Sequence, residues 1–509
     1  MRFAKMALNC TSNDGLTAET CVIGAGPAGL VAAYELSKAQ RSVMVIEKDR
    51  NHVGGLSRTV EYKGFRFDIG GHRFFSKNRL VEDLWTEILG ERMLVRKRLS
   101  RIYYRGKLFR YPLEVGDVLR KLGPREASSC VLSYALAKRI PADRIFTFEE
   151  WVTSAFGRRL YEIFFKTYTE KVWGMPCSQI SADWAAQRIR GFSMRELIAN
   201  AFSLGARNRA PIIKTLIDSF RYPRLGPGEM WDTLAETLRG RAVPIHMGEQ
   251  VKKITRGQLG AASVVTQGAT GTGVYSASQF ISTMPIRELI SALDPPAPAE
   301  VQDAAARLQY RDFLMVVLIL ERAHLFPDQW IYIHDPDVLV GRIQNFGNWS
   351  PDMVPDQRHT VLGLEYFCFD SDSLWQSSDE QLIALAFGEL SRLKLAQGAR
   401  LVEGVVVRQR AAYPIYDNDY RARVTVVRDF VARELPNLQL VGRNGMHKYN
   451  NQDHAMMTGL MAARNVLGES YDPWRVNSDA LYLEEEGRAE QGSRLVPERV
   501  DAERIAAAR

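Results

Sequence analysis

A glycine-rich turn near the start of the chain carries the first residues whose spacing could bind a ligand. Gly24, Gly26 and Gly29 follow the pattern Gly-x-Gly-x-x-Gly, with Pro27 and Ala28 between the second and third glycines. Glycines at this spacing allow a tight turn, a close approach of the backbone to a pyrophosphate and close packing of a helix on a strand. The N–H groups that open the next helix would face the phosphates. The turn therefore predicts a dinucleotide site.

Two further features indicate which dinucleotide binds. Glu47 stands about 20 residues beyond the glycines, where a carboxylate hydrogen-bonds ribose hydroxyls and disfavours a 2′-phosphate. Lys48 follows it directly. A second glycine pair with a basic side chain lies just beyond, in the run Gly54, Gly55, Leu56, Ser57 and Arg58. This pairing favours FAD over NAD, and we expect Glu47, Lys48 and the second glycine run to contact the cofactor.

The elements that would position these residues are read from apolar periodicity. A strand at 19–23, a helix at 28–39 and a strand at 42–46 form a β-α-β unit around the turn. Helical spacing then dominates residues 80–210, and short strand-like pieces return at 242–283. Further strands are predicted at 313–320, 329–334, 341–346, 360–369 and 438–441, with helices at 379–395 and 453–467.

These elements predict an α/β fold, with a Rossmann-like FAD-binding domain, a helical insertion and a mainly antiparallel β-sheet domain. The FAD-binding domain is expected to be discontinuous. Its boundaries are predicted at 18–78, 225–300 and 435–470, with a mainly helical substrate or lid domain at 79–224, a β-sheet substrate domain at 301–434 and a C-terminal extension at 471–509. From Glu484 onward the tail lacks an apolar face, which is typical of a loose helix or a disordered segment.

Composition narrows the class of protein. The 509 residues are enough for two or three structural units, and 46% hydrophobic with 25% charged residues is average for a soluble globular protein. Lys and Arg exceed Asp and Glu by 67 − 59 = 8. No basic run is typical of a nucleic-acid arm, so no nucleic-acid partner is expected. The basic residues either meet phosphate in one pocket or are spread evenly over the surface.

The cysteines and apolar runs make several other classes unfavourable. Five scattered cysteines without a Cys-x-x-Cys pair favour neither a disulfide framework nor a zinc site, and no metal is expected. The longest apolar run, 313–320, is far shorter than the ~18 residues of a membrane span, so no stable membrane insertion is expected. Residues 1–18 lack the features of a secretory signal, which leaves the cytoplasm as the expected location.

Five separate segments carry a more specific pattern. The first is 67–75, with Gly70, Gly71 and His72, and the second is 104–107 with Tyr104, followed by Tyr111 and Pro112. The third is 148–174, with Tyr168 and Trp173, and Arg188 follows Trp173 by fifteen positions (188 − 173 = 15). The fourth is 330–333 with Tyr332, followed by Arg342, and the fifth is 412–415 with Tyr413, followed by 442–454 with Gly442, Arg443, Tyr449, Asn451 and Gln452. Together they resemble the UDP-galactopyranose mutases, members of the larger group of flavoproteins that includes amine oxidases and protoporphyrinogen oxidase.

The resemblance implies a role for each segment. Gly70, Gly71 and His72 would lie near the flavin N5, and Gly442, Arg443, Tyr449, Asn451 and Gln452 would also approach the flavin. Tyr104, Tyr168 and Trp173 would enclose the substrate. Its diphosphate would be held by Arg188, Arg342, Tyr332, Tyr413 and Tyr449, because an arginine fork can bind phosphate oxygens bidentately. Without the resemblance, Arg188 would be a solvated helix residue and Arg342 a structural ion pair. His72 would either modulate the flavin or make a structural hydrogen bond.

The activity implied by this resemblance is a pyranose–furanose ring contraction with no net redox. Reduced FAD would attack the anomeric carbon through N5 and displace the nucleoside diphosphate of UDP-galactose, so an external reductant is needed. The enzymatic alternative is an FAD-dependent oxidase or desaturase that removes a hydride from an amine, tetrapyrrole or polyene. A non-catalytic binding protein is a third possibility. Residues 191–222 depart from the bacterial mutases, and residues 221–228 match the eukaryotic type only loosely, so the identities of the sugar and of the nucleotide base stay open. Whether the protein forms a homo-oligomer is also open.

Overall fold

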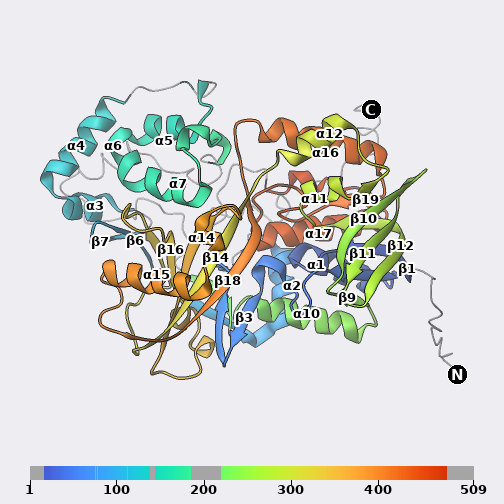
Figure 1. Ribbon diagram of the computed structural model, residues 1–509, viewed down its shortest axis with the longest axis horizontal. Coiled ribbons are helices and arrows are strands. Elements are labelled where there is room, and N and C mark those ends of the chain that lie inside the picture. The colour runs from blue at the N-terminus through green and yellow to red at the C-terminus, as the bar shows by residue number, and fades with distance from the viewer. Residues whose placement is uncertain are drawn as a thin grey trace.

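The computed structural model describes residues 16–74, 76, 78–111, 113–137, 141, 144–184 and 219–477 (Figure 1). Two large sheets dominate these residues, and they lie side by side with helices packed around them. Arg188 and the tail from Glu484 onward, both subjects of predictions, lie outside the described ranges.

The first sheet has eight strands within the described ranges, in the order β13-β10-β11-β12-β1-β2-β9, with β19 paired to β12. Strands β1, β2, β9, β12 and β19 pair in parallel, whereas β10, β11 and β12 form an antiparallel meander. The strand bounds are β1 Leu16–Ile23, β2 Val43–Glu47, β9 Ile245–Met247, β10 Gln250–Gly257, β11 Gly260–Gly268, β12 Gly271–Ser282, β13 Leu293–Asp294 and β19 Leu438–Leu440. This is the Rossmann-like sheet predicted from the β-α-β pattern.

Helices cover both faces of this sheet. They are α1 Pro27–Lys38, α2 Arg79–Leu89, α10 Gly228–Gly240, α11 Ile286–Ser291, α12 Ala299–Ala306, α16 Tyr420–Glu434 and α17 Gln452–Val466. Helices α1 and α17 approach so closely that a Cβ added at Gly459 would lie 2.1 Å from the Ala28 carbonyl oxygen. Small residues at this contact therefore bring the middle of α17 beside the start of α1.

The second sheet has seven strands within the described ranges, in the order β18-β14-β17-β16-β15-β6-β7. All neighbours are antiparallel except β15 and β6. The strand bounds are β6 Ser100–Tyr104, β7 Lys107–Arg110, β14 Tyr310–Glu321, β15 Trp330–Ile333, β16 Arg342–Asn345, β17 Thr360–Cys368 and β18 Arg400–Pro414. The sheet confirms the predicted mainly antiparallel half of the α/β fold. Helices α14 Ser373–Gln376 and α15 Asp379–Arg392 pack on it, and α13 Phe346–Trp349 follows β16.

Helices α3 Val115–Leu122, α4 Pro124–Ala135, α5 Phe148–Phe156, α6 Arg158–Tyr161 and α7 Thr167–Trp173 gather at the end of the molecule opposite β10–β12 (Figure 1). A π-helical turn, η4 (Glu162–Lys166), joins α6 to α7. The stretch expected to be helical also contains the hairpin of β6 and β7, and it contains β5 Met93–Lys97, which pairs in antiparallel with β8 Ser219–Pro223. β6 also pairs with β15, and both β15 and β8 lie more than 100 residues from their partners, so local periodicity does not detect these pairs. The last pair, β3 Thr59–Tyr62 with β4 Phe65–Asp68, follows the second glycine run.

Candidate functional site

One cavity of about 650 Å³ runs from the glycine turn to the inner face of the second sheet. Its wall is built from the ends of β1 and β2, the start of α17, strands β15, β16 and β18, and helix α7. Residues from both ends of the described chain therefore meet around one space large enough for an elongated ligand.

The glycine turn has the geometry that a pyrophosphate requires. Gly24 has φ +102°, and a Cβ at Gly29 would lie 1.9 Å from the Gly24 carbonyl oxygen, so both positions require glycine. Gly26 differs, because a Cβ there would meet no protein atom within 4 Å although the residue lines the cavity. Gly26 caps α1, with Pro27 in its first turn and Ala28 also on the cavity wall. The open space beside Gly26 fits a phosphate held at the helix N-terminus.

Glu47 lies at the end of β2 with 8% of its surface exposed. Its Oε2 accepts a hydrogen bond from the Ala25 N–H (2.7 Å) and its Oε1 accepts one from the Asp49 N–H (2.8 Å). Each carboxylate oxygen keeps a lone pair for a ribose hydroxyl. Lys48, Gly55, Leu56 and Ser57 line the same part of the cavity, whereas Gly29 and Gly54 support the turn from behind.

The loop that contains Gly70, Gly71 and His72 forms the middle of the cavity. A Cβ at Gly71 would lie 1.9 Å from Cζ3 of Trp330, so this loop rests directly on the second sheet. His72 Nε2 makes a 2.9 Å hydrogen bond with the Ile69 carbonyl. Burial, with a smaller effect of the Arg443 charge, lowers the pKa of His72 to about 4. His72 is therefore neutral at physiological pH and holds the loop.

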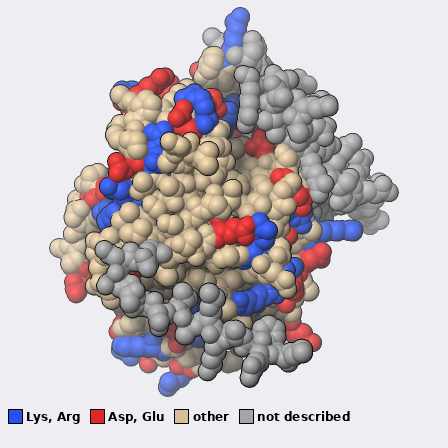
Figure 2. Space-filling view, turned by 90° about the vertical axis from the view of Figure 1, so that its right-hand side faces the viewer, with Lys and Arg blue, Asp and Glu red and all other residues tan. Residues whose placement is uncertain are grey.

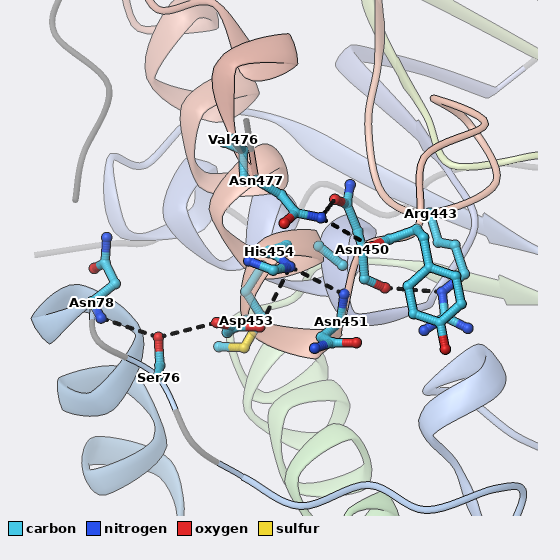
Figure 3. Close-up of polar contacts among 12 residues, drawn as sticks. Ser76, Asn78, Arg443, Asn450, Asn451, Asp453, His454, Val476 and Asn477 are labelled. Carbon is cyan, nitrogen blue, oxygen red and sulfur yellow. Dashed lines mark hydrogen bonds and ion pairs between the residues drawn. The ribbon is translucent and has the colours of Figure 1, made fainter. Parts of the chain in front are cut away.

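The start of α17 forms the opposite side of this middle region. Asn451 caps the helix, with its backbone N–H bonded to His454 Nδ1 at 3.2 Å (Figure 3). Gly442, Arg443, Asn451 and Gln452 all line the cavity. Gln452 is 9% exposed, and its Oε1 has no hydrogen-bond partner among the described residues. A helix N-terminus and an amide oxygen without a partner among the described residues, both on the cavity wall, fit the polar edge of a flavin.

Arg342 is the buried cation of the second sheet. It forms an ion pair with Glu365, which is directly opposite in the β16–β17 register, and its Nη2 donates to the Tyr413 hydroxyl at 2.8 Å. Burial alone would lower the pKa of Arg342, but Glu365 and the nearby tyrosines raise it well above its usual value. The guanidinium is thus permanently charged, and it lies 5.1 Å from the Trp330 ring centre.

Two tyrosines lie beside this arginine on the way to the flavin side. Tyr413 and Tyr449 stack with ring centres 5.7 Å apart, and Arg443 lies 4.8 Å from the Tyr449 ring centre. The Arg443 guanidinium donates to the carbonyls of Asn450 and Ala412, at 2.9 and 3.0 Å. Trp173 packs edge-on against both tyrosines. Aromatic hydroxyls, a guanidinium and an indole thus converge on one part of the cavity.

The distal part of the cavity is mostly aromatic. Tyr168 stacks on His334 with ring centres 4.9 Å apart and packs edge-on against Tyr332 at 5.6 Å. Like Gly29 and Gly54, the predicted residue Tyr104 does not line the cavity; its ring lies 6.3 Å from Phe164, and Ile102 and Tyr111 line the wall nearby. Sequence reasoning gave no site role to several lining residues, namely Arg73, Phe164, Phe165, Trp184, Trp330 and His334, nor to the supporting Glu365. The single acidic residue in the apolar run 360–368 was the available signal for Glu365.

Asp68, two residues before Gly70, is a buried carboxyl group that should make the stability of the fold depend on pH. It contacts the Tyr222 hydroxyl and accepts from Thr59 Oγ1 at 2.8 Å, and burial raises its pKa to about 7. A carboxyl group with a raised pKa in the folded state stabilises the fold at low pH, and this contribution is lost as pH rises from about 4 through about 7. The free energy of unfolding contributed by Asp68 should therefore fall by up to about 1.4 kcal/mol per pH unit in this window. Asp68→Asn should flatten that slope.

Urea unfolding between pH 4 and pH 8 measures this effect. Asp83→Asn, at an exposed position of α2, is the control and should keep the wild-type slope. If the free energy of unfolding depended on pH equally in wild type and Asp68→Asn, the prediction would be wrong.

The fold and the cavity define a dinucleotide-binding flavoprotein. Residues 27–467 match the flavin containing amine oxidoreductase family, and the chain belongs to this family. It is thus a flavoenzyme of the amine oxidase superfamily, and the family implies FAD as its cofactor. The residues at Gly26, Glu47 and Gln452 fit that group.

Individual relatives differ in the activities that their names carry. The chain is 29% identical over 170 residues to a probable UDP-galactopyranose mutase of Klebsiella pneumoniae, covering 32% of this chain and 42% of that protein. It is 25% identical over 310 residues to the putative flavin-containing monoamine oxidase AofH of Mycobacterium tuberculosis (strain CDC 1551 / Oshkosh), covering 58% of this chain and 63% of that protein. The chain thus spans less than two thirds of the length of either relative.

Solved structures support the fold assignment. A reduced UDP-galactopyranose mutase superposes with a TM-score of 0.77 at 24% identity, covering 91% of this chain and 97% of that one. A putative protoporphyrinogen oxidase from Exiguobacterium sp. 255-15 gives a TM-score of 0.67 at 18% identity, covering 90% and 100%. Both likenesses establish the same two-sheet architecture.

The surface and the helices add two observations. On the face shown in Figure 2, basic and acidic side chains are interspersed without a continuous basic area. Among the helices that the structure describes, none combines the length and the apolar character needed to cross a membrane.

Proposed function

We propose that the protein is an FAD-dependent nucleotide-sugar mutase that interconverts pyranose and furanose forms, with UDP-galactose as its first substrate to test. The observation that carries this proposal is the buried Arg342, held by Glu365 and bonded to Tyr413 in the cavity wall. A guanidinium in this position suits a diphosphate, because its planar fork can bind phosphate oxygens bidentately.

Unsatisfied donors support the same class of ligand. The indole N–H groups of Trp173, Trp184 and Trp330 have no acceptor among the described residues, and all three tryptophans line the cavity. A diphosphate and a sugar are rich in acceptors, whereas a polyene has almost none. Buried donors without partners cost stability, so an acceptor-rich ligand is favoured.

In this proposal the residues divide the work between binding and orientation. Bound FAD in its reduced form supplies a nucleophilic N5 for attack on the anomeric carbon. Arg342, Tyr332, Tyr413 and Tyr449 hold the leaving diphosphate, and Arg188 is the proposed second cation. Because Glu365 balances the charge of Arg342, a second cation is needed to match the diphosphate. Trp173 and Tyr168 border the substrate, and neutral His72 fixes the Gly70–Gly71 loop.

An FAD-dependent oxidoreductase is the second candidate. The aromatic lining of the distal cavity, which includes Phe164, Phe165 and Tyr168, also suits an apolar substrate. The similarity to the putative monoamine oxidase AofH supports this alternative.

Turnover by the holoprotein in two redox states separates the candidates. Purified protein, reduced with dithionite without oxygen, is incubated with UDP-galactose and other nucleotide sugars, and products are resolved by chromatography. We expect furanose product with reduced FAD and none with oxidised FAD, because only the reduced flavin is nucleophilic at N5.

The oxidised protein is assayed in parallel for oxygen consumption with amines and a tetrapyrrole. Steady oxygen consumption without any nucleotide-sugar conversion would overturn the mutase proposal and support the oxidoreductase.

A further inference from the structure

The loop between β19 and α17, residues 441–451, carries cavity residues without the support of regular structure. Arg443, Tyr449, Asn450 and Asn451 all line the cavity from this loop. Backbone groups outside helices and strands need other partners. The Tyr449 N–H, for example, donates to the Tyr416 hydroxyl at 2.6 Å. The position of Tyr449 therefore depends on side chains from other parts of the chain.

One set of tethers comes from the segment that follows α17. Residues 471–477, here called the C-terminal strap, contain the short helix η7 (Pro473–Arg475) and pack on α17. The strap is anchored at its start, where Asn465 Nδ2 donates to the Tyr471 carbonyl (3.0 Å) and Asn465 Oδ1 accepts from the Tyr471 N–H (2.7 Å). The family match ends at residue 467, so the strap lies beyond it.

At its other end the strap is bonded to the cavity loop. Asn477 Nδ2 donates to the Tyr449 carbonyl at 2.9 Å and to Asn450 Oδ1 at 3.2 Å (Figure 3). Lys448 Nζ donates back to the carbonyls of Trp474, at 2.9 Å, and Val476. The loop and the strap thus exchange hydrogen bonds in both directions.

These bonds continue to the residues that line the cavity. Asn450 Nδ2 donates to the Gly442 carbonyl at 3.0 Å, and the Asn450 carbonyl accepts from Arg443 Nε at 2.9 Å. Asn450 is 1% exposed, so its side chain has few alternative positions. Asn477 therefore orients Asn450, and Asn450 in turn bonds to Arg443 (Figure 3). The Arg443 guanidinium is thereby held against the Tyr449 ring.

We propose that Asn477 and Lys448 are positioning residues, through which the C-terminal strap sets Tyr449 and Arg443 against the bound ligand. Neither residue lines the cavity. The strap contributes no catalytic group and acts by holding the loop in one geometry, which lowers the cost of ordering it when a ligand binds.

Two variants sever the tether at different points. Asn477 has φ +58°, a conformation that glycine adopts freely, so Asn477→Gly removes the amide without strain in the backbone. Lys448→Met keeps an unbranched side chain that matches the lysine as far as Cε and removes the Nζ donors. Arg475→Lys changes the exposed face of the same strap and is the matched control.

The ligand readout is the affinity for UDP, titrated into oxidised holoprotein and followed through the flavin absorption band. We expect each tether variant to bind UDP about tenfold more weakly, equivalent to about 1.4 kcal/mol, with unchanged FAD content and with Arg475→Lys equal to wild type. In the mutase assay, which rests on the proposed function, KM should rise about tenfold with kcat changed less than twofold. The double variant should lose little beyond either single variant, because both act through one strap.

A lower melting temperature with wild-type UDP affinity and KM would overturn the proposal and leave the strap a purely structural element. Fully additive effects in the double variant would also overturn it. If one variant fails to fold, the other decides by the same affinity criterion. If wild type binds no UDP, the proposed function fails by itself. The strap is then tested by the position of the flavin absorption band without ligand. Both tether variants should shift this band by the same amount, and Arg475→Lys should leave it at the wild-type position.

Discussion

Arg342→Lys is expected to lower kcat/KM for the nucleotide sugar on the order of 100-fold, the range observed when one preorganised donor to a developing charge is lost. Lysine keeps the charge beside Glu365 but lacks the planar fork that bonds to Tyr413 and to a phosphate at the same time. Most of the loss should lie in kcat, because the leaving diphosphate gains charge in the transition state. Steady-state kinetics with reduced holoprotein measure the effect.

Arg400→Lys provides a matched control in the same sheet. Arg400 forms an ion pair with Glu321 at the surface of the β14–β18 pair, and its side chain is 69% exposed. Its substitution should leave kcat/KM within twofold of wild type, because exposed pairs contribute little. Equal kinetics for Arg342→Lys and wild type would contradict a role for Arg342 in holding the leaving group.

Gly26→Ala is expected to yield a folded protein that has lost FAD. No protein atom lies within 4 Å of the added Cβ, so the methyl group occupies only the space proposed for a phosphate. FAD affinity should fall by at least 100-fold, roughly the loss of 3 kcal/mol, because the phosphate can no longer approach the backbone. The flavin-to-protein absorbance ratio of the purified protein, together with circular dichroism, measures both outcomes.

Gly29→Ala and Gly388→Ala complete this comparison. A Cβ at Gly29 meets backbone at 1.9 Å, so Gly29→Ala should destabilise the apoprotein itself. Gly388, in helix α15, has open space around its added Cβ, and alanine there should raise the free energy of unfolding by about 1 kcal/mol. Retention of wild-type FAD content by Gly26→Ala would show that the turn does not hold the pyrophosphate.

Local features of the sequence were sufficient to predict the cofactor half of the molecule. The strand before Gly24, the helix after Gly26 and the strand that ends at Glu47 are adjacent in the chain, so their packing follows from periodicity and turn chemistry. The apolar run that became β14 was also identifiable, because almost all of its residues are buried. The mainly antiparallel second sheet followed from similar runs.

The parts that could not be predicted depend on contacts between distant residues. Glu365 reaches Arg342 only through the β16–β17 register, and β6 joins β15 across more than 200 residues. Tyr104 was expected on the cavity wall, but its ring packs near Phe164, a contact across 60 residues (164 − 104 = 60), and Ile102 and Tyr111 line the wall instead. The placement of Arg188 is a prediction that lies outside the described residues.

The contact between Gly71 and Trp330 has a consequence for how such a cavity can change in evolution. Trp330, Tyr332 and His334 are alternate residues that all line the cavity, and the first of them abuts the loop beside the cofactor. His334 directly follows the end of β15 and, at ~3.3 Å per residue, lies about 13 Å from Trp330 along the strand direction. β15 therefore runs from the cofactor side of the cavity toward its distal side. A substitution at His334 can alter which substrates fit the distal part of the cavity, while the contact between Trp330 and Gly71 beside the cofactor stays the same.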